Sequence, residues 1–226
     1  MHRHIFLFTF CMLTMFSIDA QDWANTSRYA HQNDSLAQIP NTGHRVVLMG
    51  NSITDDWVDF HPQFFTENQL IGRGVSGQTS SQMVARFRLD VLNLRPSVVV
   101  INAGTNDIAE NTGPYNEELT MSNIVSMVEL ARLHRIQVVL TSVLPSDGFV
   151  WNTSITDAPA KIASLNERIS RYAQDHAIPY VDYYKQMVVP ATGALIAEFT
   201  YDGVHPTGAG YEVMEALLLP VVTQLR

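Results

Sequence analysis

The sequence contains very little cysteine: of its 226 residues, only Cys11 is a cysteine. That residue lies in an apolar stretch near the N-terminus, so residues 21–226 hold no thiol and can form no disulfide. Disulfide-dense scaffolds are therefore excluded, and a core of ordinary apolar side chains must hold the fold together. A chain of this length can bury such a core, so the fold would not require disulfides even outside the cell.

Basic residues are scarce as well. The chain has 14 Lys and Arg against 22 Asp and Glu, which gives a formal net charge of −8 at pH 7. Nucleic acids and anionic membranes bind basic surfaces, so neither is expected as a partner. The charge disfavours these two classes of partner, and the sequence leaves the oligomeric state open.

The apolar stretch from Ile5 to Phe16 is shorter than the ~20 residues that a membrane-spanning helix needs. A short basic segment precedes it and the small residue Ala20 follows it, an arrangement typical of a cleavable secretory signal. We therefore predict a signal peptide over residues 1–20 with cleavage near Ala20. The mature protein would be periplasmic or extracellular, with no stable membrane insertion.

Residues 21–226 contain no repeat, low-complexity tract or Pro/Gly-rich linker, which predicts a single domain. Four apolar runs rich in β-branched residues resemble strands, at residues 46–49, 97–102, 138–142 and 180–183. The runs do not alternate with polar residues, as expected of strands covered on both faces. Leu70 and Ile71 could end a further strand.

Helical patterns separate these runs, and the last of them covers about residues 208–222. Alternating strands and helices predict a three-layer α/β/α domain with a central parallel sheet. The polar segment at residues 22–36 carries a few apolar side chains and is predicted to be a helix docked on the outside. In a sheet of this kind, the active site lies beyond the carboxyl ends of the strands.

Two polar segments follow predicted strands, and a third lies near the C-terminus. Ser52 follows the first strand, and Asn106 lies shortly after the second. Asp202 and His205 form an Asp-x-x-His pair far downstream. A serine hydroxyl becomes a nucleophile when an oriented imidazole takes its proton, so these side chains could form a nucleophilic hydrolase site.

The glycines at positions 72, 74 and 77 match the dinucleotide fingerprint G-x-G-x-x-G. The context argues against that function, because the next strand ends in Asn102 rather than in an acidic residue that would hold a ribose. An exported protein would also meet little free nicotinamide cofactor. We expect no cofactor here, and we interpret the glycines as positions where a backbone N–H approaches a substrate oxygen.

Taken in order, four short segments resemble the conserved blocks of the SGNH (GDSL-type) hydrolases, which include thioesterase/lysophospholipases and platelet-activating-factor-acetylhydrolase-like esterases. The segments are Gly50-Asn51-Ser52, Gly74-Val75-Ser76-Gly77, Gly104-Thr105-Asn106-Asp107 and Asp202-Gly203-Val204-His205-Pro206. The resemblance covers the chain from about Arg45 to its end and implies a flavodoxin-like α/β/α fold. Position 51 is Asn where the family has Asp, and position 72 is Gly where Asn is frequent.

The resemblance also implies roles for five residues. Ser52 would be the nucleophile, His205 the general base and then the acid, and Asp202 the residue that orients the imidazole. The backbone N–H groups of Ser52 and Gly77 and the side-chain amide of Asn106 would form the oxyanion hole. Such fixed donors are required because acyl transfer passes through a tetrahedral oxyanion.

Two other enzyme classes fit the sequence less well. An α/β-hydrolase has the same Ser…Asp…His order, but Thr54 stands where its G-x-S-x-G elbow needs a second glycine. A metal-dependent phosphoesterase could use Asp55, Asp56 and Asp107, but the sequence lacks an H-E-x-x-H pair. We therefore expect no metal site.

The substrate is the least determined property. Trp57, Tyr115 and Trp151 are candidate substrate-binding residues because they lie on segments that follow strand ends, although packing roles fit them equally well. The segments at residues 111–119 and 146–159 are mostly small or polar, which favours a short acyl group, chiefly acetyl, on a sugar or another polar alcohol. A lysophospholipase or thioesterase remains an alternative, as does an inactive carbohydrate-binding protein of the same fold.

The signal-peptide hypothesis predicts the N-terminus of the mature protein. When the protein is expressed in its own host, N-terminal sequencing of the active, soluble form should begin at or near Gln21. An intact Met1 on that form would contradict the prediction.

Overall fold

The computed structural model describes residues 22–41 and 44–226. The signal peptide predicted over residues 1–20 lies outside these residues. Among the helices that the model describes, none is long and apolar enough to cross a membrane.

Five parallel strands form one sheet in the order β2-β1-β3-β4-β5. The strands are β1 (Val46–Gly50), β2 (Leu70–Gly74), β3 (Val98–Ile101), β4 (Gln137–Thr141) and β5 (Tyr180–Val181). This order is that of flavodoxin-like sheets, in which the connections leave in opposite directions on either side of β1 and β3. The predicted three-layer α/β/α fold with a parallel sheet is therefore confirmed.

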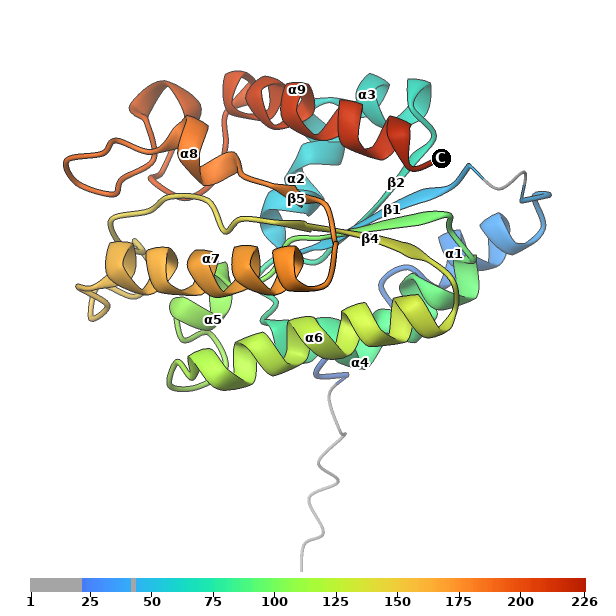
Figure 1. Ribbon diagram of the computed structural model, residues 1–226, viewed down its shortest axis with the longest axis horizontal. Coiled ribbons are helices and arrows are strands. Elements are labelled where there is room, and N and C mark those ends of the chain that lie inside the picture. Colours follow the sequence, from blue (N-terminus) through green and yellow to red (C-terminus); the bar gives the residue numbers. More distant parts are fainter. Residues whose placement is uncertain (1–21, 42–43) are drawn as a thin grey trace, which may run out of the picture.

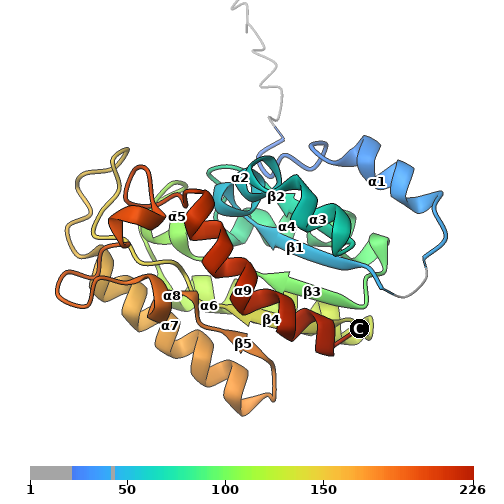
Figure 2. The same ribbon diagram turned by 90° about the horizontal axis from the view of Figure 1, so that it is seen from above.

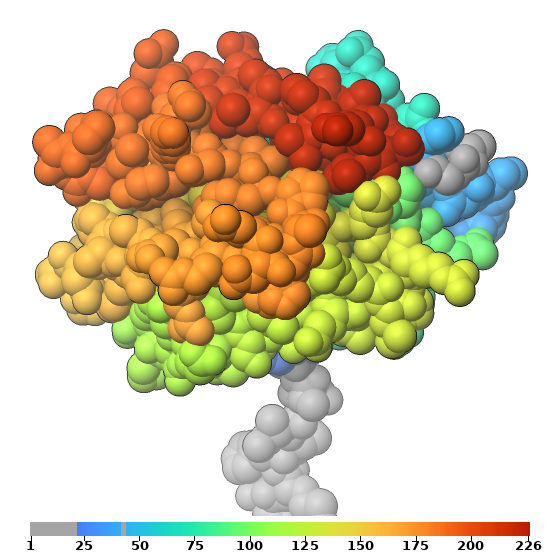
Figure 3. Space-filling model, viewed as in Figure 1, coloured from blue at the N-terminus to red at the C-terminus, as the bar shows by residue number. Residues whose placement is uncertain are grey.

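Helices cover both faces of the sheet (Figure 1). One face carries α2 (Ser52–Phe60), α3 (Pro62–Glu67), α8 (Tyr183–Met187) and α9 (Gly208–Gln224). The other carries α4 (Ser80–Asp90), α6 (Glu117–Leu133) and α7 (Ala158–Asp175). In the space-filling view, α9 and the segment around α8 lie above α7, and α6 lies below it (Figure 3).

The side chains of β1 show why its sequence is apolar throughout. Val46 and Leu48 belong to the apolar cluster under α2 and α9, whereas Val47 and Met49 belong to the cluster under α4 and α6. All four are at most 2% exposed. Successive side chains of a strand point to opposite faces, so a strand covered on both faces needs an uninterrupted apolar run.

Two predicted elements differ in extent. The segment from Asp22 was predicted to be helical as far as residue 36, but the helix α1 is confined to Ala30–Ala37 and residues before it form turns. Asn25 has a positive φ of 49°, and the Asp22 carboxylate accepts the backbone N–H of Ser27, so the chain begins as a hydrogen-bonded turn. As predicted, α1 lies on the outside, against α4 (Figure 2).

The second difference concerns the strands at the edges of the sheet. The possible strand at Leu70 is β2, which extends to Gly74 and forms one edge. At the other edge, β5 is shorter than predicted, because Tyr183 already belongs to α8. The remaining connections contain η1 (Leu92–Leu94), η2 (Ala197–Phe199) and the short helix α5 (Thr105–Ile108).

The start of α2 packs against the end of β2 at backbone distance. A Cβ atom added to Gly74 would lie 2.1 Å from the backbone nitrogen of Asp55 and 2.6 Å from the carbonyl oxygen of Asn51. No side chain fits there without a shift of the backbone. This close approach positions the turn that carries Ser52.

The close approach at Gly74 predicts that Gly74→Ala destabilises the protein. The expected loss in free energy of unfolding is about 1–3 kcal/mol, because the added methyl group meets backbone atoms that cannot move aside. Gly148→Ala is the matched control, since a Cβ there has nothing within 4 Å. Urea denaturation measures both variants, and equal stability of the two would contradict the prediction.

Candidate active site

The carboxyl ends of the strands meet at one edge of the sheet, at the left of Figure 1, where α2, α5 and α8 begin. Ser52 follows β1 as the first residue of α2, and Asn106 lies in α5 after β3. The strand order reverses between the neighbouring parallel strands β1 and β3. Open α/β sheets bind ligands at such a switch point.

Asn51 caps the helix that begins at Ser52. Its side-chain oxygen accepts the backbone N–H of Ile53 at 3.0 Å, and the residue is fully buried. The Asn that departs from the family pattern thus keeps the capping function of an Asp. Its Nδ2 atom is buried and has no hydrogen-bond partner among the described residues.

Ser52, His205 and Asp202 form a chain of hydrogen bonds. The Oγ of Ser52 lies 2.9 Å from Nε2 of His205, and Nδ1 of His205 lies 2.6 Å from Oδ2 of Asp202. The side chains of His205 and Asp202 are 15% and 23% exposed, so the group opens toward solvent. The three side chains predicted from the sequence as a triad are thus adjacent and in triad order.

The loop itself orients Asp202. Its second carboxylate oxygen, Oδ1, accepts the backbone N–H groups of Val204 and His205 at 2.9 and 2.8 Å. Burial alone would raise the pKa of Asp202, but the hydrogen bonds from His205 and Val204 outweigh it and hold the pKa below its usual value. Asp202 is therefore an anion that can stabilise a cationic imidazole.

Two unused backbone donors point to an oxyanion site. Within residues 22–41 and 44–226, the backbone N–H groups of Ser52 and Gly77 donate to no backbone or side-chain acceptor. Gly77 has a positive φ of 77°, a conformation that glycine adopts without strain. The side-chain amide of Asn106 donates one hydrogen to the backbone oxygen of Gln78 at 3.0 Å, which places the amide next to Gly77.

Asp107 holds this part of the site from behind. Its carboxylate accepts the backbone N–H of Ser80 at 2.9 Å and the hydroxyl of Thr120 at 3.2 Å. Burial raises the pKa of Asp107, and the hydrogen bonds from Ser80 and Thr120 oppose that shift. Asp107 thus ties α4 and α6 to the segment that carries Asn106.

Two exposed aromatic rings flank His205. The ring of Tyr201 stacks on the imidazole with a centroid distance of 5.7 Å, and the indole of Trp151 lies 5.9 Å away. Burial and the neighbouring Asp56 carboxylate raise the pKa of Tyr201 to about 12, so its hydroxyl stays protonated and donates to Asp56. Tyr201 was not predicted, although its place just before Asp202 was a usable signal.

A polar groove of about 460 Å³ extends from Gly77 to Trp151. Its other walls include Gln78, Asn111, Thr112 and Asn152. Asn111 accepts the indole N–H of Trp151 at 2.9 Å and donates to the backbone oxygen of Gly77 at 3.0 Å. Of the three aromatic residues predicted to bind substrate, Trp151 thus lies beside the candidate triad.

Trp57 does not line the groove, and that prediction is wrong. The residue is 2% exposed, and its ring stacks on Phe64 and Tyr211 at centroid distances of 5.6 and 5.4 Å. Its indole N–H donates to Glu215 on α9. The face of α2 that carries Trp57 turns toward α9 and away from the strand ends, so its role is packing.

Tyr115 lies elsewhere too. It packs against the apolar cluster under α4 and α6, and the amino group of Lys161 lies 5.7 Å from its ring centroid. It lines a separate pocket of about 250 Å³, together with Trp23 and Asp107. Among the described residues, no group of three or more His, Cys, Asp and Glu side chains is arranged to hold a metal ion.

A model of the GDSL-like lipase/acylhydrolase family matches residues 34–213. Two solved structures are similar over most of the chain. A protein of Bacteroides fragilis NCTC 9343 assigned as an acylhydrolase is 57% identical, with a TM-score of 0.89 and coverage of 91% of this chain and 100% of that one. A GDSL-like lipase of Bacteroides thetaiotaomicron VPI-5482 is 56% identical, with a TM-score of 0.88 and coverage of 90% and 99%.

A multidomain esterase of Ruminococcus flavefaciens is 30% identical over 131 residues. The match covers 53% of this chain but only 14% of that protein. An uncharacterized lipoprotein of Bacillus subtilis (strain 168) is 32% identical over 79 residues, which are 32% of its length. The chain therefore spans a minor part of these curated relatives.

Proposed function

The chain belongs to the GDSL-like lipase/acylhydrolase family, and from that premise we propose that it is an exported serine esterase acting on short-acyl esters of sugars or small polar alcohols. Family membership supports ester hydrolysis as the reaction. The observation that carries the mechanism is the hydrogen-bonded series Ser52–His205–Asp202. Export rests on the N-terminal sequence alone.

In the proposed first step, Ser52 attacks the ester carbonyl. His205 takes the hydroxyl proton on Nε2, which lies 2.9 Å from Oγ. The ester C=O becomes a tetrahedral oxyanion, and Asp202 stabilises the imidazolium that forms. When the intermediate collapses, the C–O bond to the alcohol breaks, and His205 returns the proton to the leaving alkoxide.

The second step hydrolyses the acyl-enzyme. Water takes the place of the alcohol, His205 removes one of its protons, and the resulting hydroxide adds to the acyl carbon. Collapse of this second tetrahedral intermediate releases the acid, and the proton returns to Oγ of Ser52. The partial exposure of His205 and Asp202 suits this step, because water must reach the imidazole.

The backbone N–H groups of Ser52 and Gly77 and the amide of Asn106 would bind the oxyanion in both steps. Two observations support this assignment. The two backbone donors are unused among the described residues, and Asn106 is 2% exposed and anchored by Gln78. Donors held rigidly in this way need no reorganisation when the negative charge develops.

The groove beside Gly77 supports a polar alcohol as the leaving group. Its walls carry amides, hydroxyls, the carboxylate of Glu110 and one indole, and that indole is 43% exposed and held by Asn111. A flat, fixed aromatic face beside hydrogen-bonding side chains suits a sugar ring, which has apolar C–H faces and a polar rim. The same walls offer little apolar surface for a long acyl chain.

Substitution of the triad and of the oxyanion donor tests the mechanism. Ser52→Ala and His205→Ala should each lower kcat by up to ~10⁶, because the members of such a unit act together. Asn106→Ala should lower kcat by ~10²–10³ with little change in KM, because the lost donor acts on the transition state. Ser126→Ala on α6 is the control and should keep full activity.

These variants would be assayed with p-nitrophenyl acetate, with and without a chelator. Activity that survives in Ser52→Ala but disappears with the chelator would contradict the proposal in favour of a metal-bound water.

Chain-length preference tests the proposed substrate. For p-nitrophenyl esters from acetate to palmitate, kcat/KM should be highest for acetate, and acetylated polysaccharides should release acetate. Trp151→Ala should lower kcat/KM on the acetylated polysaccharide by about 3- to 10-fold, mainly through KM, because one stacking face is lost. Trp23→Ala removes another exposed tryptophan, 54% exposed against 43% for Trp151, and is the control.

A preference for acyl chains of eight or more carbons, without release of acetate from sugars, would favour the lysophospholipase or thioesterase alternative. Absence of any ester hydrolysis, combined with binding of the polysaccharide, would favour an inactive carbohydrate-binding protein.

A further inference from the structure

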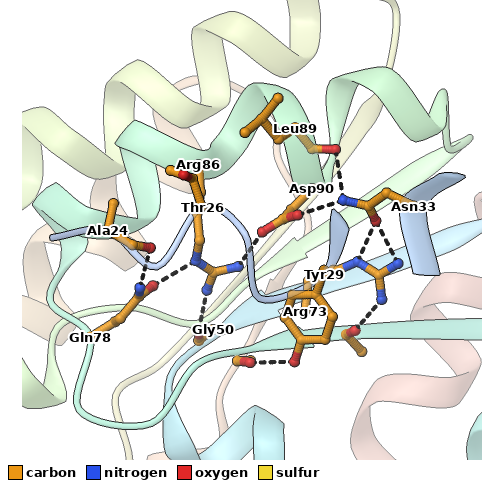
Figure 4. A network of polar contacts seen from close by, with 12 residues as sticks. Ala24, Thr26, Tyr29, Asn33, Gly50, Arg73, Gln78, Arg86, Leu89 and Asp90 are labelled. Carbon is orange, nitrogen blue, oxygen red and sulfur yellow. Dashed lines mark hydrogen bonds and ion pairs between the residues drawn. The ribbon is translucent and has the colours of Figure 1, made fainter. Parts of the chain in front are cut away.

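Arg86 is a charged side chain with no exposed surface at all. It lies on α4, and its guanidinium donates hydrogen bonds to two other segments and to Asp90 of its own helix (Figure 4). The acceptors are the backbone oxygen of Gly50 at 2.9 Å, the side-chain oxygen of Gln78 at 2.6 Å and the carboxylate of Asp90 at 2.9 Å. Two of these acceptors belong to the segments of the candidate active site.

The first acceptor precedes the nucleophile. Gly50 is the last residue of β1, and the turn Asn51–Ser52 follows it directly. Its carbonyl oxygen also accepts the backbone N–H of Val75, at 3.2 Å. Arg86 therefore binds the peptide group from which the Ser52 turn leaves the sheet.

The second acceptor, Gln78, follows the glycine whose backbone N–H is a proposed oxyanion donor. Gln78 is next to Gly77, and its backbone oxygen accepts the side-chain amide of Asn106. Its side-chain amide donates to the backbone oxygen of Ala24, at 2.6 Å. Gln78 is thus held by Arg86 on one side and by the segment before α1 on the other (Figure 4).

Stability alone does not explain a charge in this place. Burial of a guanidinium costs free energy that its ion pair with Asp90 does no more than offset, and apolar replacements of such pairs are often as stable. A fork of fixed N–H donors, however, can hold the backbone oxygen of one segment and a side-chain oxygen of another in one geometry, which an apolar side chain cannot do. The observed hydrogen bonds use the fork in this way.

We propose that Arg86 is a positioning residue for ester hydrolysis, which holds the Ser52 turn and the Gly77 loop at the separation that the oxyanion requires. This inference rests on the proposed function, since it assigns a task to the same site. The segment before α1 takes part through Ala24, and Asn33 of α1 donates to the second oxygen of Asp90 at 2.8 Å. The segment before α1 is then the outer support of the oxyanion hole through Ala24, whereas Asn33 reaches Asp90 and not Gln78 or Gly50.

Arg73 supplies a matched control within the same network. It is also buried, at 4% exposure, and its guanidinium lies 4.5 Å from the centroid of the Tyr29 ring. Its hydrogen bonds go to the backbone oxygen of Gly72 and to the side-chain oxygen of Asn33. Neither acceptor adjoins Ser52, Gly77 or Asn106, so loss of Arg73 should affect stability and leave the oxyanion hole in place.

The test compares Arg86→Met/Asp90→Leu with Arg73→Met. The double variant removes both charges of the ion pair, so neither Arg86 nor Asp90 is left as its unpaired half. Gln78→Met is a second variant that cuts the link to Gly77 and leaves Arg86 and Asp90 paired. Each is purified as the full mature chain, and its thermal midpoint, kcat, KM and pH profile on p-nitrophenyl acetate are measured.

The expected result is a fall in kcat of about 10- to 100-fold for Arg86→Met/Asp90→Leu and for Gln78→Met, with KM changed less than threefold, because misplaced donors weaken only transition-state binding. The pH profile of kcat/KM should keep its shape, since Asp202 and His205 are untouched. Arg73→Met should keep kcat within about threefold even if its thermal midpoint falls equally, in line with a purely structural role.

A kcat near that of the wild type in both network variants would overturn the inference. So would an equal loss in Arg73→Met, since the effect would then follow stability. Ser52→Ala is assayed in parallel to separate the two proposals. If Ser52→Ala is inactive and the network variants are active, only the role of Arg86 fails. If Ser52→Ala retains activity, both proposals fail.

Discussion

Apolar side chains pack against both faces of the parallel sheet, and this packing sets where each strand ends and which segments meet beyond it. A one-residue shift of β1 would exchange Val46 and Leu48 with Val47 and Met49, which belong to different clusters. With the register set, Gly50 pairs with Gly74, and α2 starts at backbone distance from β2. The position of Ser52 is therefore a consequence of core packing.

The candidate site combines a local unit with distant ones. Asp202 and His205 are three residues apart, and hydrogen bonds within that short loop orient both side chains. Ser52 comes from 153 residues earlier in the chain, and the Gly77 and Asn106 donors come from two further segments. The local unit can be arranged by its own turn, whereas the proposed oxyanion donors depend on contacts among several elements.

Asn111 links the groove beside Gly77 to the proposed oxyanion donors. One end of its amide accepts the indole N–H of Trp151, and the other donates to the backbone oxygen of Gly77. The groove wall and the oxyanion loop are thus connected through one side chain. In the proposed reaction, a sugar stacked on Trp151 would therefore lie next to the loop proposed to bind the developing negative charge.

The apolar pattern of residues 46–226 predicted most of the fold. Strands buried on both faces must be apolar throughout, and the helices between them must repeat apolar residues every three to four positions. The edge strand β2 was harder to recognise, since Gly72, Arg73 and Gly74 interrupt its apolar run. Glycine is required at position 72 because a Cβ would collide with Val58, and at position 74 because a Cβ would collide with the Asn51–Asp55 segment. No local sequence pattern reveals these contacts.

The sequence by itself determined the candidate chemical groups and the family resemblance: a serine after a buried strand, an Asp-x-x-His pair and two loops of glycine and asparagine, in that family's order. Only the tertiary structure decided which aromatic residues face the site. Trp57 and Trp151 both follow strand ends, yet one is 2% and the other 43% exposed. The reason is physical: the burial of Trp57 depends on which face of α2 meets α9. Likewise, the buried hydrogen bonds of Arg86 join segments that lie far apart in the chain.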